Sequence, residues 1–427
     1  MSSTREQRDV VVIGGGIGGL AAAVLLARGG RTVTLVEKAP RFGGRAITTE
    51  REGFKFNLGI HAFYSGGPGE AVLRELGITL SGGQTDRSLY ECQDGARIGR
   101  LPVDADSLAT SEVLDPASRA ELAWLLRLLR TEPLHVWRGR PVSAWLEQHA
   151  RQPVVRRLLE AVVRLATYTH APDEVDAEYA LSLVGSQRGA LLLDGGWQTL
   201  VNGLESAARA AGVEMIHGAA VTGIELGPPH TVRLPTRTLH TTAVVVATDV
   251  MAAARLLELP SVDAWAARTR PVRAACLDLA LHALPDPRRL VVLRLDQPLY
   301  YSVHSRSCRL APGDGALLHL VKYLPLRPSD LDEDPREDRR QLEAWLDELQ
   351  PGWREVVVAS QFLPRIQVSG DAVTAGQQGL QGRPSPIVPD APGVYLVGDF
   401  VGAQDHLAHA SLASAEAVAR DVLERAA

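Results

Sequence analysis

The stretch "DVVVIGGGIGGLAAAVLLARGG", residues 9–30, decides the fold of this chain. A run of β-branched residues is followed by a glycine cluster and then by an Ala/Leu-rich segment that ends at Gly29 and Gly30. This order predicts a buried strand, a tight turn and a helix. The next strand, "RTVTLVEK" (31–38), contains Glu37 near its end, about 20 residues beyond the glycines. We therefore expect a β-α-β unit that binds a dinucleotide.

The glycines of this cluster are expected to have separate tasks. Gly14 permits the sharp turn, Gly16 lets the backbone approach a pyrophosphate, and Gly19 lets the helix pack closely on the strand. The helix N-terminus then faces the phosphates. Glu37 is placed to accept ribose hydroxyls, and its charge disfavours a 2′-phosphate, which leaves NAD or FAD. A glycine-rich turn without a ligand would not explain why strand, turn, helix, strand and acid fall in register.

A second glycine pair follows in "EKAPRFGGRA" (37–46), where Gly43 and Gly44 precede Arg45. Bare backbone and a cation close behind the ribose site suit a longer ligand, whose pyrophosphate continues toward a flavin. The whole stretch "VVVIGGGIGGLAAAVLLARGGRTVTLVEKAPRFGGRA" (10–46) resembles the N-terminal signature of the FAD-dependent amine oxidase and phytoene desaturase superfamily. Within that superfamily it looks closer to the desaturase-like bacterial NAD(P)/FAD-dependent oxidoreductases.

Four later segments resemble the same superfamily in the same order. They are "GFKFNLGIHAFY" (53–64), the segment 195–226, "TAVVVATDVMAAARLL" (242–257) and "GVYLVGDFVGAQDHLAHASLASAEAVARDVL" (393–423). The resemblance implies FAD as the cofactor, held without a covalent link. The cofactor contacts that it implies, together with those argued above, are Gly14, Gly16, Ile17, Gly18, Gly19, Glu37, Lys38, Gly43, Gly44, Arg45, Gly59, Ile60, His61, Val221, Ala247, Thr248, Gly398, Asp399, Leu407 and Ala408.

The expected fold class is α/β, or α+β overall, with a Rossmann-type FAD-binding domain, a β-sheet substrate domain and a helical cap. We expect a discontinuous FAD-binding domain from residues 1–65, 195–255 and 385–427. Residues 66–194 would supply part of the substrate domain and the cap, and 256–384 its sheet and a surface helix.

Local patterns add detail to the second half of this prediction. Residues 118–137 and 153–170 have the apolar spacing of helices, and 276–284, 289–295 and 315–324 read as strands. The charged segment 324–340 is expected to be a solvated surface loop that leads into a helix over 341–350.

Three histidines are the candidate proton carriers. His61 is the first choice, because the resemblance places it beside the flavin and imidazole titrates in a suitable range. The other interpretation, which is slightly favoured, is a structural histidine that bonds to the cofactor or the backbone. His406 and His409, just before the last helix, come next. Tyr64, Tyr168 and Lys322 are weaker candidates.

The resemblance also indicates the reaction. Amine oxidases of the superfamily carry an aromatic side chain and a lysine near the flavin, where an alignment by eye places Leu407 and Leu277 here. An apolar flavin face favours dehydrogenation or desaturation of a small, largely apolar metabolite by hydride transfer to flavin N5. Two alternatives stay open: a flavin amine oxidase, and a non-enzymatic prenyl-binding carrier of the same fold. The electron acceptor is O2, a quinone or NAD(P)+.

Composition excludes several other classes. A formal net charge of −5 disfavours a nucleic-acid partner. The three cysteines, Cys92, Cys276 and Cys308, have no metal-binding spacing, so no metal site is expected and reduced thiols in the cytoplasm are the simplest interpretation. Apolar bulk with Arg127 and Arg130 in residues 120–137 suggests a stretch that covers the route to the active site or makes peripheral membrane contact.

Overall fold

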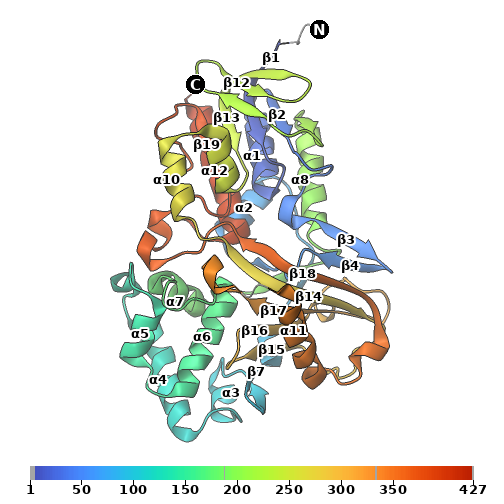
Figure 1. The fold of residues 1–427 in the computed structure, drawn as a ribbon, viewed down its shortest axis with the longest axis vertical. Helices are drawn as coiled ribbons and strands as arrows, with labels where there is room; N and C mark the ends of the chain where they lie inside the picture. Colours follow the sequence, from blue (N-terminus) through green and yellow to red (C-terminus); the bar gives the residue numbers. More distant parts are fainter. Residues whose placement is uncertain (1–4, 187, 332–333, 426–427) are drawn as a thin grey trace.

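The computed structural model describes residues 5–186, 188–331 and 334–425. In these ranges the chain forms two seven-stranded sheets, one in the upper and one in the lower half of Figure 1. The first sheet has the order β10-β2-β1-β13-β12-β11, with β19 also paired to β13. Its strands are β1 (Arg5–Ile13), β2 (Val33–Val36), β10 (Glu214–Ile216), β11 (Gly223–Glu225), β12 (His230–Arg233), β13 (Thr238–Val246) and β19 (Val394–Leu396).

Helices cover both faces of this first sheet, because its strand side chains alternate between two apolar cores. Val10 and Val12 of β1 pack with helices α1 (Ile17–Arg28), α8 (Gln198–Ala210) and α12 (Leu407–Glu424). Val11 and Ile13 point the other way, toward α9 (Val250–Leu257) and α10 (Pro260–Arg268). A strand buried on both faces requires the nearly continuous apolar run that the sequence shows.

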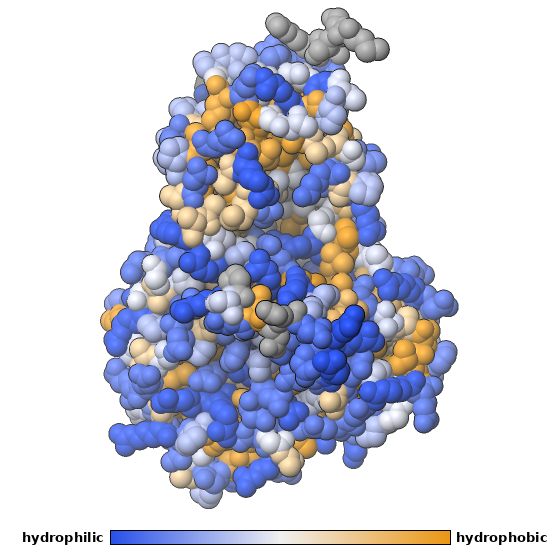
Figure 2. Space-filling view, in the orientation of Figure 1, coloured by the Kyte–Doolittle hydropathy of each residue, from blue (hydrophilic) through white to orange (hydrophobic). Residues whose placement is uncertain are grey.

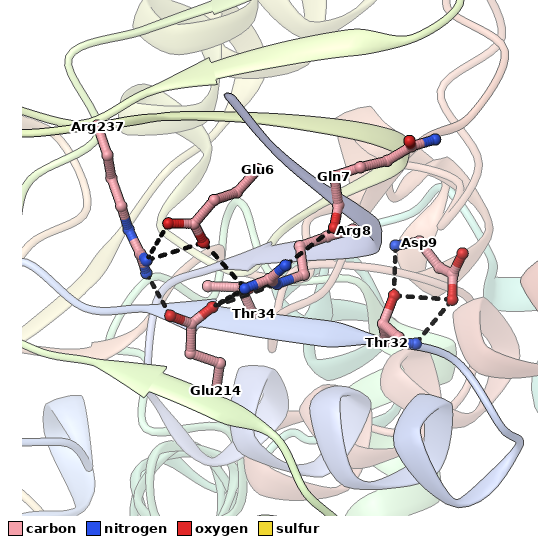
Figure 3. A network of polar contacts seen from close by, with 8 residues as sticks. All are labelled: Glu6, Gln7, Arg8, Asp9, Thr32, Thr34, Glu214 and Arg237. Carbon is pink, nitrogen blue, oxygen red and sulfur yellow. Dashed lines mark hydrogen bonds and ion pairs between the residues drawn. The ribbon is translucent and has the colours of Figure 1, made fainter. Parts of the chain in front are cut away.

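An ion-pair network ties the starts of these strands together (Figure 3). Arg8 on β1 pairs with Glu6 and with Glu214 of β10, and Thr34 of β2 donates its hydroxyl to the same Glu214 carboxylate at 2.7 Å. Arg237, just before β13, reaches both glutamates. The network lies at the end of the sheet opposite the glycine turn. It therefore fixes the register of the strands and takes no part in chemistry at the turn.

The second sheet has the order β18-β14-β17-β16-β15-β7-β8. One face packs on a helical layer and the other on α11, as the lower half of Figure 1 shows. Its strands are β7 (Tyr90–Asp94), β8 (Arg97–Arg100), β14 (Val272–Leu281), β15 (Val291–Arg294), β16 (Leu299–Val303), β17 (Ala316–Tyr323) and β18 (Val357–Ser369). The helices are α3 (Ala105–Ala109), α4 (Pro116–Thr131), α5 (Val142–His149), α6 (Pro153–Thr167), α7 (Ala177–Ser186) and α11 (Pro335–Leu349).

Smaller elements connect the two halves. β3 (Thr48–Arg51) pairs with β4 (Phe54–Asn57), and β9 (Ala190–Leu193) pairs with both β5 (Phe63–Tyr64) and β6 (Gly82–Gln84). Helix α2 (Pro68–Glu75) packs on α12. Short 3-10 turns are η1 (Gly44–Ala46), η2 (Arg87–Leu89), η3 (Leu134–Trp137), η4 (His304–Arg306), η5 (Pro328–Asp330), η6 (Trp353–Val356), η7 (Ala375–Gln377) and η8 (Gly379–Gly382).

The predicted fold class is confirmed, and several local predictions need correction. The helix expected over 118–137 ends at Thr131, and a separate 3-10 turn follows Pro133. The loop expected over 324–340 is helical from Pro335 onward, because Asp334 caps that helix by accepting the backbone N–H of Arg336. Residues 332 and 333 of that segment lie outside the described ranges.

The charged segment is also not wholly solvated. Asp338 of α11 is fully buried, and its carboxylate pairs with Lys322 Nζ at 2.8 Å and with an Arg365 nitrogen at 2.6 Å. Lys322, one of the weaker proton-carrier candidates, is therefore part of the contact between α11 and the second sheet. The domain boundaries given above stay predictions, and no helix in the described part of the chain has the length and apolarity needed to cross a membrane.

Candidate active site

A cavity of about 740 Å³ lies at the carboxyl ends of β1, β2 and β13. This volume falls in the range of about 300–1,000 Å³ that small-molecule sites occupy. The same edge of an open α/β sheet is where such ligands bind. Every cofactor contact expected from the sequence lies in the cavity wall except Gly59, whose neighbours Leu58 and Ile60 line it.

The glycines of the first turn have two different roles. Close packing requires two of them, and a third faces open space. A Cβ at Gly14, whose φ is +107°, would lie 2.4 Å from the Ala247 carbonyl oxygen, and one at Gly19 would lie 1.9 Å from that of Gly14. At Gly16 a Cβ would meet no described atom within 4 Å. Gly16 therefore faces the cavity with bare backbone, which is what close approach of a pyrophosphate requires.

The carboxylate of Glu37 is held by backbone amides. Glu37 is 8% exposed, and its Oε2 accepts the N–H of Gly15 at 2.7 Å while its Oε1 accepts that of Ala39 at 2.8 Å. Each carboxylate oxygen has a second lone pair for a further hydrogen bond. The acid is thus oriented in the cavity wall before any ribose hydroxyl reaches it.

The second glycine pair closes over the first turn. The N–H of Gly43 donates to the carbonyl of Gly15 at 2.8 Å, and both Gly43 and Gly44 have positive φ. The next residue, Arg45, forms a two-pronged ion pair with Asp399, with both nitrogen–oxygen distances at 2.9 Å. The two glycines therefore let the chain turn so that Arg45 reaches Asp399, just past the carboxyl end of β19.

Asp399 is 3% exposed, and its carboxylate also accepts the Gly370 N–H at 2.8 Å. Burial alone would raise the pKa of Asp399, but the Arg45 guanidinium outweighs that effect and the pKa lies below its usual value. Asp399 is therefore ionised at neutral pH, and Arg45 supplies the compensating charge in the cavity wall.

The C-terminal motif reaches the cavity through a constrained backbone. Asp405 and Leu407 have φ values of +58° and +52°, a region that costs non-glycine residues about 1–3 kcal/mol each. The constraint aims the first turn of α12 at the cavity, where Leu407, Ala408 and Ser411 form part of the wall. Since that turn contains no acidic residue, the positive end of the helix dipole faces the cavity uncompensated.

His61 lies in the cavity wall, with its ring edge-on to Trp197 at 5.1 Å between centroids. Its Nδ1 is 3.1 Å from the Gly59 carbonyl and its Nε2 is 3.0 Å from that of Arg45. Burial lowers the pKa of His61 more than these carbonyls raise it. The ring is therefore neutral at pH 7, and its single N–H can donate to only one of the two carbonyls.

Apolar and aromatic side chains surround His61. Ile60, Ile366 and Leu407 line the cavity here and pack against the core of the helical layer. Tyr168 lines the cavity as well, and its hydroxyl lies 2.6 Å from that of Tyr64. Burial raises the pKa of Tyr168 to about 12, so this hydroxyl stays protonated. We call the wall formed by Ile60, His61, Tyr168, Ile366 and Leu407 the reaction end, and the wall from Gly14 to Glu37 with Val221 the nucleotide end.

Comparison with known proteins identifies the family. A model of the family described as "FAD dependent oxidoreductase" matches residues 9–420, almost the whole chain. The chain belongs to the FAD dependent oxidoreductase family. This membership shows that the chain is an FAD-dependent oxidoreductase, as the sequence predicts.

Shorter matches connect the chain to curated proteins. It is 50% identical over 60 residues to all-trans-retinol 13,14-reductase of Danio rerio, a match that spans 14% of this chain and 10% of that protein. It is 55% identical over 51 residues to carotenoid 3,4-desaturase of Haloarcula japonica, over 12% of this chain and 10% of that protein. These matches span only about a tenth of each relative.

Solved structures share the fold over nearly the full length. An oxidoreductase from Methanosarcina mazei superposes with a TM-score of 0.77 at 20% identity, covering 96% of this chain and 100% of that one. Cyclohexylamine oxidase from Brevibacterium oxydans gives a TM-score of 0.73 at 19% identity, over 98% of this chain and 99% of that one. At these identities the likeness concerns the fold.

Of the three histidine candidates, the FAD cavity is lined by His61 alone. His409 is 1% exposed and accepts the Gly69 N–H at its Nδ1, while its Nε2 contacts the Tyr64 carbonyl at 2.6 Å, so it holds α12 against the segment before α2. His406 Nδ1 lies 2.9 Å from Asp405 Oδ1, and that acid also pairs with Arg188. Both histidines therefore have structural partners outside the wall.

Two expectations about the reaction end are not met. Leu277 is buried in the core between the second sheet and α11, because side chains alternate along β14 and Leu277 faces away from the helical layer. No residue of 120–137 lies in the described cavity wall, so this stretch does not line the cavity, and its covering of the route to the active site stays a prediction. Their apolar side chains Leu122, Leu125 and Leu129 face the helical core instead.

Sequence reasoning also missed parts of the wall. Trp197, Asp249 and Arg255 lie in segments recognised as FAD-binding, but no local pattern marks them as wall residues. Ile366, Gln367 and Val368 come from β18. The sequence pattern did not predict this strand, because it contains Pro364. Proline is tolerated there because β18 is the edge strand of its sheet.

Proposed function

We propose that this chain is an FAD-dependent dehydrogenase or desaturase of a small, largely apolar metabolite. The observation that carries the proposal is the reaction end, where His61 is the titratable imidazole in a wall of aliphatic and aromatic side chains. Such a wall favours an apolar substrate by the hydrophobic effect and offers it a single positioned proton acceptor.

The positions of the carboxylates in the cavity wall disfavour an amine substrate. Of the described residues that line it, Glu37, Asp249 and Asp399 are the acids. Glu37 accepts two backbone amides, Asp249 caps α9 by accepting the Ala252 N–H at 2.8 Å, and Asp399 pairs with Arg45. None of the three acids belongs to the reaction end, so that wall offers no carboxylate to an ammonium group.

The named relatives support the same choice. The carotenoid desaturase and the retinol reductase are named after apolar polyenes. Both match this chain at high identity over a short segment. An amine oxidase remains the second candidate, since the chain is 46% identical over 61 residues to an L-amino-acid oxidase of Naja atra and shares the fold of cyclohexylamine oxidase. A prenyl-binding carrier is disfavoured by membership of an enzyme family.

Glu37, Gly16 and the first turn of α12 would hold the cofactor, and Arg45 would supply positive charge near it. Bound there, FAD would supply the hydride-accepting chemistry of the reaction. The ring nitrogen of His61 that carries no hydrogen would leave its carbonyl neighbour and take the proton lost from the adjacent carbon, and the apolar wall would keep water from competing for the site. Tyr168, protonated in this range, can donate a hydrogen bond but cannot act as a base.

The experiment that tests this proposal is an anaerobic spectral titration. The purified yellow protein is mixed in turn with apolar polyenes, cyclic alkenes, primary amines and amino acids, and loss of flavin absorbance is recorded. Bleaching by an apolar compound supports the proposal, and bleaching by amines alone overturns it. Restoring the colour with O2, a quinone or NAD(P)+ then identifies the electron acceptor.

Location and membrane contact belong to the same proposal. Cys92, Cys276 and Cys308 are all buried free thiols, which fits a reducing cytoplasm. Near α4 the exposed large apolar side chains are Trp124 and Val136. In Figure 2 the wide lower part of the visible face is mostly hydrophilic, with scattered apolar spots. Co-sedimentation with anionic vesicles at low salt tests peripheral contact, which Trp124→Ala would abolish.

A further inference from the structure

A row of polar side chains crosses the second sheet where apolar residues would be expected. Ser302 on β16 stands opposite His319 on β17, His319 opposite Asp278 on β14, and Asp278 opposite Gln361 on β18. All four are buried, and Asp278 and His319 have no exposed surface. A row of cross-strand partners has its side chains on one face of the sheet, so these groups adjoin one another.

Hydrogen bonds connect the row. His319 Nδ1 lies 2.7 Å from Asp278 Oδ1, and Gln361 Nε2 donates to Asp278 Oδ2 at 3.1 Å. The ring of His304, from η4, packs on the ring of His319 with 4.4 Å between centroids. Among the described residues, His319 Nε2 and His304 Nδ1 have no hydrogen-bond partner.

Stability does not explain this arrangement. Removing an ionisable pair from water costs several kcal/mol per ion, and apolar residues of the same volume often serve a core at least as well. The unpartnered ring nitrogens of His304 and His319 add to the cost. Groups that accept and release protons, kept in a core at such a cost, indicate a role in proton transfer.

One end of the row reaches a second, small pocket. His304 and Ser302 line a space of about 30 Å³, together with Asp86 and Arg306. This space is large enough for one or two water molecules. Asp86 and Arg306 are the charged groups of its described lining, and Cys308 contacts the His304 carbonyl through its thiol. The pocket gives the His304 ring a route to solvent.

The other end adjoins the FAD cavity. Gly59, whose carbonyl contacts His61, packs so closely on β14 that a Cβ there would lie 3.1 Å from Cys276 Sγ. Asp278 is the second residue after Cys276 on the same face of that strand. The charged groups also interact with one another. Burial lowers the pKa of His61, and the nearby Asp278 carboxylate raises it. Burial is the main cause of the lowered pKa of His304, and His61 lowers it further.

We propose that Asp278, His319 and His304 form a proton path between His61 and the small pocket, a role that rests on the proposed function. His61 gains a proton when the substrate is oxidised and must lose it before the next turnover. The path transfers that proton to the pocket, and each group returns to its starting protonation. No described hydrogen bond links His61 to Asp278 or His319 to His304, so ring rotation or a bridging water completes each of these two transfers.

The test needs no knowledge of the substrate. FAD-loaded protein is reduced with one equivalent of dithionite and mixed with O2 in weakly buffered solution that contains a pH indicator. Reoxidation transfers two electrons to O2 and forms H2O2, which takes one proton from the reduced cofactor and one that neutral His61 relays from the His319–Asp278 pair. The same path then brings a replacement proton in from solvent, so colour return and proton uptake should coincide in the wild-type protein.

Two variants block the path without removing a structural bond. His304→Leu replaces a ring whose Nδ1 has no described partner, and His319→Gln keeps an N–H donor for Asp278 but cannot pass a proton on. Both should bind FAD normally, while proton uptake lags colour return by about tenfold or more. His240→Gln, on β13 of the first sheet and outside the wall, is the matched control and should show no lag.

Coincident colour return and proton uptake in both variants, or an equal lag in His240→Gln, would overturn the proposal. If His304→Leu does not fold, His319→Gln decides the question. A second readout uses the protein without cofactor: in histidine-selective NMR titrations, His319→Gln should shift the titration midpoint of His61, which a purely structural role would leave unchanged. Because the assay uses dithionite and O2, it gives a result even if no apolar metabolite bleaches the flavin.

Discussion

The two ends of the cavity are built in different ways. At the nucleotide end, backbone hydrogen bonds hold the polar groups in place: Glu37 accepts two N–H donors, and the Gly43 N–H donates to the Gly15 carbonyl. At the reaction end, apolar side chains from the helical layer and β18 surround His61. The nucleotide end is organised before FAD arrives, whereas the reaction end selects by shape and apolarity.

The largest effect is expected in the glycine turn, where two substitutions of one type should both weaken FAD binding but differ in their effect on stability. Gly19→Ala places a Cβ 1.9 Å from the Gly14 carbonyl oxygen, so it should destabilise the fold by about 1–3 kcal/mol and abolish FAD binding. Gly16→Ala meets no described protein atom, so its thermal unfolding should match wild type while FAD affinity falls about 100-fold. Thermal melts and FAD titration of the apoprotein measure both.

If Gly16→Ala retained full FAD occupancy, the space in front of this residue would not be the pyrophosphate site. If Gly19→Ala melted as the wild type does, the turn would be more plastic than its close contacts indicate. Either outcome would break the contrast between a pre-organised nucleotide end and an adaptable reaction end.

The next effect concerns Glu37. Its charge-assisted hydrogen bonds to ribose hydroxyls are worth about 1.5–3 kcal/mol, so Glu37→Ala should weaken FAD binding by about 10- to 100-fold. Glu37→Gln keeps the size and one carbonyl acceptor and should lose less. Fluorescence titration of the apoproteins with FAD measures the difference, and equal affinity in all three proteins would show that another residue holds the ribose.

The sequence predicted the nucleotide end far better than the reaction end. Gly14, Gly16, Gly19 and Glu37 lie within one β-α-β unit, so their spacing alone specifies their geometry. Leu277 was misplaced because an alignment by eye does not reveal which face of β14 a residue occupies. Period-two alternation reverses the side-chain direction with every one-residue slip.

Long-range pairing was equally invisible in the sequence. Strand β18 places Ile366 in the cavity wall and Gln361 in the polar row. Its internal proline prevented its prediction as a strand. The contact between His319 and Asp278 joins residues 41 positions apart through strand register, which no local motif records. Local chemistry was therefore predictable, and the arrangement of separate segments was not.

A smaller effect should appear in the pH dependence of stability. Burial lowers the folded-state pKa of His304 below its unfolded value of about 6.5, so the unfolded chain binds more protons below that pH. The free energy of unfolding should therefore rise with pH up to about 6.5, by up to about 1.4 kcal/mol per pH unit from this residue. Urea unfolding of the apoproteins between pH 5 and 8 should show that His304→Leu loses this part of the slope.

An identical pH slope in wild type and His304→Leu would contradict the buried, neutral state assigned to this ring. His240→Gln again serves as the control, because replacing a histidine of the first sheet leaves the environment of His304 unchanged.

The smallest effect is the expected absence of a covalent flavin link. Cys92, Cys276 and Cys308 are buried, and none of the three lies in the described cavity wall. Acid precipitation should therefore release all yellow colour into the supernatant, as measured by absorbance of the two fractions. Colour retained in the pellet would show a tether that the nucleotide end does not account for.

The central claim is that the reaction end oxidises its substrate with His61 as the proton acceptor, and stopped-flow reduction of the flavin tests it most directly. With the compound that bleaches the wild-type protein, His61→Ala should still bind FAD but reduce it about 100-fold more slowly per bound flavin. Its rate should also lose the dependence on a group that titrates below pH 6.5. An unchanged rate and pH profile, normalised to FAD content, would contradict the account and remove His61 from the chemistry.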